Sequence, residues 1–219
     1  MPRHTQKATS PKSGEPKKIG RPKSKGRPAG YVKIHQALKS LLAEKGFQDI
    51  TWGGIATTAG VSEALIYQYF KTRSGLLYSI LADYLEKYKA RIRATLDEEQ
   101  GALNKVKALI DGLLSVYDDD RVFARVLLLE VRNIPDYYES EAYALVRDFG
   151  DMCLETIQAG VASGEIRSDV EPTIMRQSLL GTVEHAILPY VIFQRQANIR
   201  QLSEYLNLLF LDAIKARPQ

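Results

Sequence analysis

The sequence has a single cysteine, Cys153, and only three histidines, and these shortages limit the kinds of site it can hold. One cysteine cannot form an internal disulfide, which fits a reducing cytoplasm. His4, His35 and His185 are scattered, and no cysteine or histidine cluster has metal-ligand spacing, so we expect no metal site. Neither a glycine-rich phosphate loop nor a nucleophile elbow is present. We therefore expect no catalytic residues, no cofactor and no enzyme activity.

Long apolar runs are also missing. No run reaches the ~18 residues that would span a bilayer, and the N-terminus lacks the apolar segment of a secretory signal. These absences predict a cytoplasmic protein with no membrane partner.

Charge is unevenly distributed along the chain. Residues 1–30 hold nine of the 30 basic side chains and one of the 26 acidic ones, so this segment carries +8 and the remainder −4. Five prolines and few apolar residues in the same segment predict a disordered basic arm. Such an arm favours a polyanionic partner, and a solubilising tail is the alternative.

The remainder predicts an all-α fold of about nine helices. No proline occurs between Ala29 and Ile134, and apolar residues recur at helical spacing. The expected helices are 32–45, 52–59, 63–70, a long one from 73, 102–117, 120–132, 136–162, 172–194 and 198–215. Pro189 is expected to kink the eighth helix or to end it early. Thr51, Ser62 and Thr72 precede three of the expected helices and are suited to cap them.

The segment from Thr51 to Phe70 is the most informative one. Two short helices joined around Gly60 suit a helix-turn-helix, in which the second helix enters the major groove with its N-terminus first. Gln68 is suited to adenine and Ala64 to a thymine methyl, while Ser62, with the helix dipole, is suited to a phosphate. The residues predicted to contact DNA in this head are Thr51, Ser62, Glu63, Ala64, Tyr67, Gln68 and Arg73.

The run from His35 to Leu77 closely resembles the DNA-binding domain of tetracycline-repressor (TetR) family regulators. The resemblance implies a three-helix head on a two-fold dimer, joined to a ligand-binding helical body. It also implies phosphate contacts at Tyr67 and at Arg73, where the family usually has lysine. Leu65 departs from the small hydroxyl residue that is common there, and Gly53 and Gly54 weaken the second helix.

The arm contains two Gly-Arg-Pro cores, centred on Arg21 and Arg27. They resemble an AT-hook, whose arginine lies in a narrow minor groove. The match is partial, since Lys25 replaces an expected arginine and Ile19 interrupts the first core. A looser reading has the arm following phosphates beside the main site, and an unstructured tail with nonspecific attraction is the alternative.

The last two expected helices carry apolar stripes at spacings of three and four residues. These stripes belong either to the core of the protomer or to a four-helix dimer interface. The residues predicted at the interface are Leu179, Val183, Ile187, Leu202, Leu206, Leu209 and Phe210. A homodimer would present two reading helices to a near-palindromic operator in double-stranded DNA.

The middle helices are rich in aromatic and apolar residues, which predicts a cavity for a small apolar or amphipathic effector. Its predicted lining is Tyr117, Phe123, Leu127, Phe149, Cys153 and His185. Leu129-Glu-Val-Arg132 and Gly164-Glu-Ile-Arg, with Gln177 and Gly-Thr-Val-Glu184, further resemble the fatty-acid-responsive branch of the family. That resemblance implies a long-chain acyl-coenzyme A as the effector.

Together these features predict a ligand-responsive DNA-binding regulator, a repressor that its effector releases from the operator. The predicted domains are the arm over 1–30, the helix-turn-helix head over 31–75 and the ligand-binding and dimerisation body over 76–219. A constitutive or architectural DNA-binding dimer with no effector is the alternative.

Overall fold

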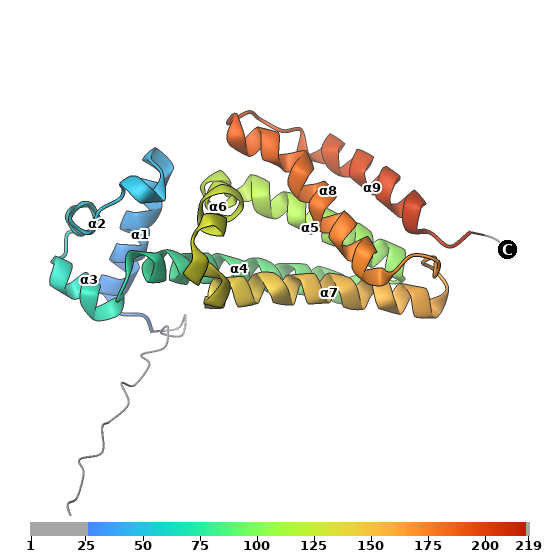
Figure 1. Cartoon of the computed structure of the whole chain (residues 1–219), viewed down its shortest axis with the longest axis horizontal. Coiled ribbons are helices and arrows are strands. Elements are labelled where there is room, and N and C mark those ends of the chain that lie inside the picture. Colours follow the sequence, from blue (N-terminus) through green and yellow to red (C-terminus); the bar gives the residue numbers. More distant parts are fainter. Residues whose placement is uncertain (1–25, 218–219) are drawn as a thin grey trace, which may run out of the picture.

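The computed structural model describes residues 26–217, and the predicted all-α fold is confirmed. Nine α-helices lie in this range, and its only β pairing is an isolated bridge between Ile166 and Lys215. The first helices form a small head, and the others form an elongated body (Figure 1).

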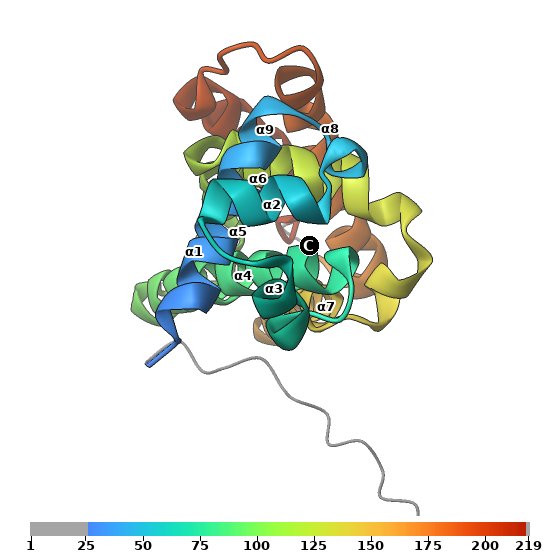
Figure 2. The ribbon, with the colours of Figure 1, turned by 90° about the vertical axis from the view of Figure 1, so that its left-hand side faces the viewer.

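The head consists of α1 (Ala29–Glu44), a 3₁₀ turn (Phe47–Asp49), α2 (Trp52–Ala59) and α3 (Glu63–Tyr69). Its core is made of apolar side chains that are fully buried, namely Ile34, Leu38, Ile50, Ile55 and Ile66. Viewed from the head end of the molecule, α2 and α3 lie in front (Figure 2).

Short-range signals correctly predicted where α2, α3 and α4 begin, whereas α1 begins at Ala29, three residues before the expected start. The side chains of Thr51, Ser62 and Thr72 each accept a hydrogen bond from the backbone NH three residues later, at 3.1, 3.3 and 2.9 Å. Each threonine or serine thereby satisfies one of the free NH groups of a helix N-terminus. Gly60 ends α2 with a φ of 63°, a conformation that glycine adopts without steric cost.

The long helix α4 (Arg73–Glu98) leaves the head and continues through the body. It packs against α7 (Glu141–Ser163) and α5 (Ala102–Asp119), and α5 packs in turn against α9 (Ile199–Ile214). The eighth helix, α8 (Pro172–Ile192), contacts α5, α7 and α9. Pro189 lies near the end of α8, which stops at Ile192, two residues earlier than predicted.

The predicted domain boundaries do not coincide with breaks in the chain. A boundary at residues 75–76 falls inside α4, so the head and the body share this helix. The boundary at residue 31 is late, because α1 already begins at Ala29. The predicted disorder of the arm concerns mainly residues 1–25, which lie outside the described part of the chain.

The segment over 120–132 is not the single α-helix that was predicted. The segment consists of α6 (Arg121–Arg125), one turn of π-helix (Val126–Glu130) and a 3₁₀ turn (Val131–Asn133). Pro135 begins a further 3₁₀ turn (Pro135–Glu139) instead of the next long helix, and α7 starts afterwards at a Ser140 cap. A π-turn is rare and often marks a functional position.

Candidate DNA-binding face and ligand cavity

The outward side of α3 carries most of the residues predicted to contact DNA. Ile66 is fully buried and fixes the rotation of α3 about its own axis. That rotation leaves a connected set of exposed side chains at Ser62, Glu63, Ala64, Tyr67 and Gln68. The structure therefore brings these five residues together on one face, and their contacts with DNA remain a prediction.

Contacts with α2 hold two of these side chains in place. The Tyr67 ring packs on the Trp52 ring, with 5.0 Å between centroids, while 45% of Tyr67 stays exposed. The Glu63 carboxylate lies close to Gly53, where an added Cβ would be 3.2 Å from Glu63 Oε1. Gly53, which lowers the helix propensity of α2, thus leaves space for the first side chain of α3. The sequence predicts that Gly53 weakens α2, but it does not reveal the contact between Gly53 and Glu63.

Arg73 is engaged inside the head. Its guanidinium donates to the carbonyl oxygen of Ile50 and lies 5.5 Å from the centroid of the Phe47 ring. These contacts tie the start of α4 to the segment before α2. If Arg73 also contacts a phosphate, as predicted, it does so while donating to the carbonyl oxygen of Ile50 or after that hydrogen bond breaks.

Arg27 is also engaged and is not part of a free arm. Its two terminal nitrogens donate to the two carboxylate oxygens of Asp83 on α4, one of them at 2.6 Å. The expected minor-groove contact of Arg27 stays a prediction, and it would require this pair with Asp83 to open. Arg21, the other predicted hook residue, lies outside the described residues.

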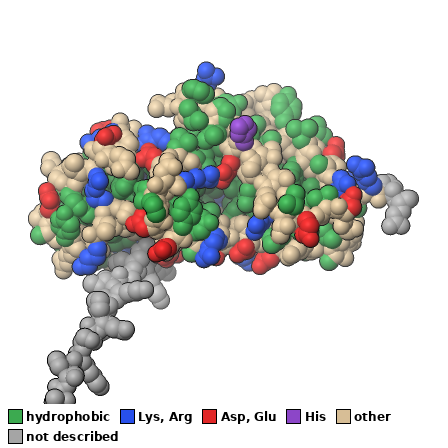
Figure 3. All heavy atoms as spheres, viewed as in Figure 1, with side chains coloured by type: hydrophobic (Ala, Val, Ile, Leu, Met, Phe, Trp, Pro, Cys, Tyr) green, Lys and Arg blue, Asp and Glu red, His purple; other side chains and the backbone are tan. Residues whose placement is uncertain are grey.

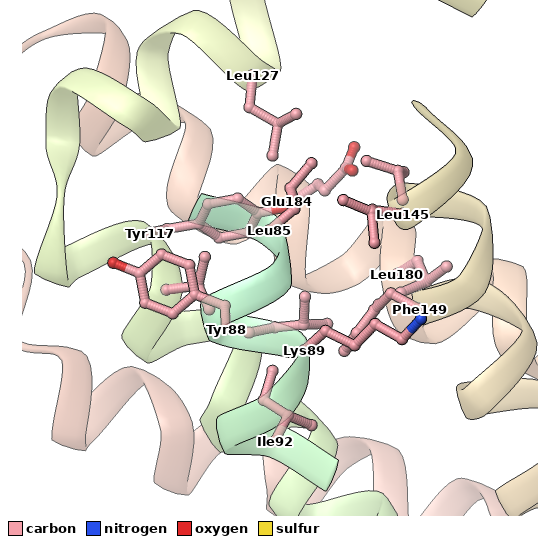
Figure 4. Close-up of a pocket in the computed structure, with 13 residues that line it drawn as sticks. Leu85, Tyr88, Lys89, Ile92, Tyr117, Leu127, Leu145, Phe149, Leu180 and Glu184 are labelled. Atoms are coloured by element: carbon pink, nitrogen blue, oxygen red, sulfur yellow. The ribbon is translucent and has the colours of Figure 1, made fainter. Parts of the chain in front are cut away.

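A cavity of about 90 Å³ lies in the body between α4, α5, the π-turn, α7 and α8 (Figure 4). Tyr117, Leu127 and Phe149 line it as predicted. The remaining lining is largely apolar and comes mostly from α4, α5 and α7: Leu85, Tyr88, Lys89, Ile92, Leu113, Val116, Leu145, Val146, Leu180 and Glu184. The sequence analysis did not place the α4 residues in the cavity wall.

Three predicted lining residues lie elsewhere. The Phe123 ring packs on Tyr84, with 5.0 Å between centroids, Cys153 is buried away from the cavity, and His185 is exposed on the outer side of α8. For His185 the cause is helical phase: its neighbour Glu184 faces the cavity, and one residue further along a helix the side chain points about 100° away.

Charged groups lie at two places on the cavity wall. Glu184 accepts a hydrogen bond of 2.7 Å from Arg132, and Lys89 forms an ion pair with Asp148. Figure 4 shows the Glu184 and Lys89 side chains at different sides of the cavity. Burial raises the pKa of Tyr117, so its phenol stays neutral. The wall thus combines an apolar interior with a few polar groups at its edge, which suits an amphipathic ligand.

The cavity is small for such a ligand. Ligand pockets usually measure ~300–1,000 Å³, against about 90 Å³ here. Binding of a drug-sized or lipid-like molecule therefore requires the surrounding helices to move apart, and that movement is what a sensor needs.

A polar contact joins the cavity wall to the head. Glu130 accepts a hydrogen bond from the backbone NH of Phe47 at 2.7 Å and pairs with Arg125 at 2.9 Å. Arg125 also donates to the carbonyl oxygens of Leu42 and Lys45 at the end of α1. We call this set of contacts, made by Arg125 and Glu130 with residues 42–47, the head–body latch. Arg125 directly precedes the π-turn whose Leu127 lines the cavity, and Glu130 is the last residue of that turn.

Large apolar side chains are exposed on α9 and directly after the end of α8. Exposed fractions reach 62% at Phe193, 63% at Leu208 and 68% at Leu209. Figure 3 shows hydrophobic side chains over this part of the surface. Isolated exposed apolar residues are ordinary, whereas a group of them over two neighbouring helices indicates a contact surface.

Some of the residues predicted at a dimer interface are buried in the protomer, and others are at least partly exposed. Leu179, Val183, Ile187 and Leu206 are 0 to 7% exposed, so they belong to the protomer's own core and their assignment to an interface is corrected. Leu202 and Phe210 are half-buried, and Leu209 is exposed. The apolar stripes face inward because the body already covers that side of α8 and α9.

The described part of the chain has neither a cluster of metal ligands nor a membrane-spanning helix. Within residues 26–217 no group of three or more His, Cys, Asp or Glu side chains is arranged to hold a metal ion. No helix in this range is long and apolar enough to cross a membrane.

Two family models match the chain. Residues 34–80 match the model described as bacterial regulatory proteins, tetR family, and residues 81–213 match the YsiA-like protein, C-terminal region. The fatty acid metabolism regulator protein of Bacillus subtilis (strain 168) is 24% identical over 184 residues, which cover 84% of this chain and 95% of that protein.

Two further proteins resemble this chain. The crystal structure of the Bacillus subtilis regulator FadR in complex with stearoyl-CoA superposes with a TM-score of 0.77 at 24% identity, covering 84% of this chain and 99% of that one. The nucleoid occlusion factor SlmA of Vibrio cholerae is 29% identical over 96 residues, which cover 43% of this chain and 49% of that protein. The structural likeness establishes the fold.

Proposed function

Because the chain belongs to the TetR family of transcription regulators, we propose that it is a cytoplasmic, homodimeric repressor that an acyl-coenzyme A releases from a near-palindromic operator. The observation that carries this proposal is the presence of an outward α3 face and of an apolar cavity in the same chain. The head–body latch connects the head to the π-turn that contributes Leu127 to the cavity wall. Two of the proteins described above are named as regulators, which fits a protein that performs no catalysis.

The effector class is supported by chemistry and by likeness. The apolar wall of the cavity suits an alkyl chain, and the structure of the similar FadR from Bacillus subtilis contains stearoyl-CoA. DNA binding without an effector is the second candidate function. The likeness to a nucleoid occlusion factor and the small size of the cavity favour it.

The reading of DNA by α3 predicts different results for two neighbouring substitutions. Gln68→Ala should relax discrimination at one base pair of each half-site, by ~1–3 kcal/mol. Tyr67→Phe keeps the ring on Trp52 and removes the hydroxyl, so it should weaken binding to all duplexes alike. Fluorescence anisotropy on a selected operator and its single-base variants measures both effects. A uniform loss for Gln68→Ala across all duplexes would remove this residue from base reading.

The effector proposal predicts that stearoyl-CoA lowers operator affinity, whereas coenzyme A alone does not. Leu145→Phe, on α7, adds volume to the cavity wall and should weaken stearoyl-CoA binding while leaving the affinity of the ligand-free protein for DNA unchanged. Leu154→Phe, on α7 and outside the cavity lining, is the matched control. Calorimetric titration and DNA binding are measured on the same preparations. If no acyl-coenzyme A alters operator binding, the effector-free alternative is favoured.

A further inference from the structure

The Tyr117 hydroxyl is a buried polar group in the wall of the largely apolar cavity. Tyr117 is only 5% exposed and lines the cavity from α5, and among the described residues none forms a hydrogen bond with its hydroxyl. Buried tyrosine hydroxyls usually have a hydrogen-bond partner, so one that lacks it inside a cavity indicates the place of a ligand atom. Burial raises the pKa of the phenol, which therefore keeps its proton and can donate it.

This hydroxyl lies toward the end of the cavity where Glu184 is. The Glu184 carboxylate and the Arg132 guanidinium are the charged groups that act on the pKa of the phenol. Figure 4 shows the Tyr117 ring reaching from α5 toward Glu184. The second tyrosine of the wall, Tyr88, packs on Phe123, which does not line the cavity, with 5.8 Å between ring centroids. Tyr117 and Glu184 are therefore the polar side chains that a ligand meets at this end.

The same end of the cavity is open to solvent. Glu184 and Arg132 form an ion pair of 2.7 Å, and their side chains are 35% and 44% exposed. An amphipathic ligand can leave its headgroup outside at this pair and extend its chain inward along Leu85 and Phe149. Its first polar group then lies beside Tyr117. Because charges interact more strongly where water is scarce, the Glu184 carboxylate opposes a second carboxylate here and tolerates a neutral carbonyl.

We propose that the Tyr117 hydroxyl donates a hydrogen bond to the carbonyl oxygen of an acyl thioester, and that the Glu184 carboxylate keeps the carboxylate of a free fatty acid out of the same place. The proposal rests on the proposed function, in which an acyl-coenzyme A is the effector. Tyr117 and Glu184 thereby select the ligand by the group that follows its alkyl chain, whereas the apolar wall accepts the chain itself.

Two ligands that differ at one group test the hydrogen bond. S-octadecyl-CoA is a thioether that has a methylene group in place of the carbonyl of stearoyl-CoA. Tyr117→Phe should weaken stearoyl-CoA binding about two- to tenfold, the range for one neutral hydrogen bond, and should not weaken thioether binding. Tyr190→Phe, on α8 and outside the cavity lining, is the matched control. Calorimetric titration of the full-length protein without DNA measures each Kd.

Stearate, the anion of the free acid at neutral pH, tests the charge. Glu184→Gln removes the repulsion and leaves Arg132 without its counter-charge, so it should raise stearate affinity at least about fivefold more than stearoyl-CoA affinity. Glu155→Gln removes the same charge from an exposed position on α7 and is the matched control. The control should leave the ratio of the two affinities as it is in the wild-type protein.

Two results would overturn the inference. One is a Tyr117→Phe protein that binds both coenzyme A ligands equally weakly, or neither more weakly than the wild-type protein does, which removes the hydroxyl from carbonyl recognition. The other is an unchanged ratio of stearate to stearoyl-CoA affinity in Glu184→Gln. If the wild-type protein binds no stearoyl-CoA at all, the proposed effector fails instead, so the two failures are distinguishable.

Discussion

Replacing Leu209 with aspartate is expected to convert the protein from a dimer to a monomer and to lower its affinity for a two-half-site operator at least about a hundredfold. Linking two DNA-binding heads makes the second contact intramolecular, which raises the overall affinity by ~10²–10⁴. A monomer loses this gain even if each head still folds. No other single substitution proposed for this protein should have a larger effect on DNA binding.

The expectation rests on the exposed face of α8 and α9. Leu209 is the most exposed large apolar residue in the described part of the chain, at 68%, with Leu208 beside it and Phe193 at the end of α8. In a two-fold dimer the same patch meets its own copy, so one substitution enters the interface twice. A carboxylate buried there without a partner strongly opposes association.

Sedimentation velocity and operator binding measure the two consequences separately. Tyr138→Asp is a suitable control, since Tyr138 is 49% exposed and lies on the 3₁₀ turn before α7, away from this face. The control should remain dimeric. A Leu209→Asp protein that sediments as a dimer would show that the interface lies elsewhere.

The second large effect is expected at the head–body latch. Arg125→Ala should leave stearoyl-CoA binding intact and remove most of its effect on operator affinity. Coupling between an effector and a ligand is typically ~1–3 kcal/mol, so a ligand response of roughly 5–150-fold should fall toward none. The reason is geometric: Arg125 precedes the π-turn that carries Leu127, and Glu130 ends it. Arg125 bonds the end of α1, and Glu130 bonds Phe47 in the turn that follows α1.

A stability effect accompanies this change and has to be separated from it. Arg125→Ala leaves the Glu130 carboxylate without its cation and the carbonyl oxygen of Leu42 without this donor, so we expect a lower melting temperature. Arg121→Ala is the control, because Arg121 also lies on α6 but pairs with Asp118 and with the carbonyl oxygen of Arg195 in the body. Ligand-linked release that is unchanged in a folded Arg125→Ala protein would exclude the latch as the connection.

Local signals predicted the head well. Thr51, Ser62 and Thr72 lie next to the apolar pattern that each helix continues, so capping and periodicity agree within a few residues of sequence. The fold class followed from the same periodicity. These features depend on neighbours in the chain, and a single sequence contains them.

Features that depend on distant contacts were not predictable in this way. The break of the segment over 120–132 into α6, a π-turn and a 3₁₀ turn accompanies the bonds of Arg125 and Glu130 to the head, about 80 residues away in sequence. The pairing of Arg27 with Asp83 spans 56 residues. No local pattern reveals such partners.

Helical phase limited the prediction of the body. The apolar stripes of α8 and α9 were recognised, but periodicity alone does not say whether a stripe faces its own core or a partner. Leu179 and Val183 face the core, and Leu209 does not. An error of one residue in the helical phase of α8 likewise led to the prediction that His185 lines the cavity, whereas Glu184 does.

Selection of bound duplexes from a random-sequence library tests the central claim most directly. A dimer that reads DNA with two copies of α3 should enrich a near-palindromic sequence whose half-sites are centred about one helical turn apart, ~34–36 Å. Enrichment of no sequence, or of one half-site without a symmetric partner, would contradict the claim.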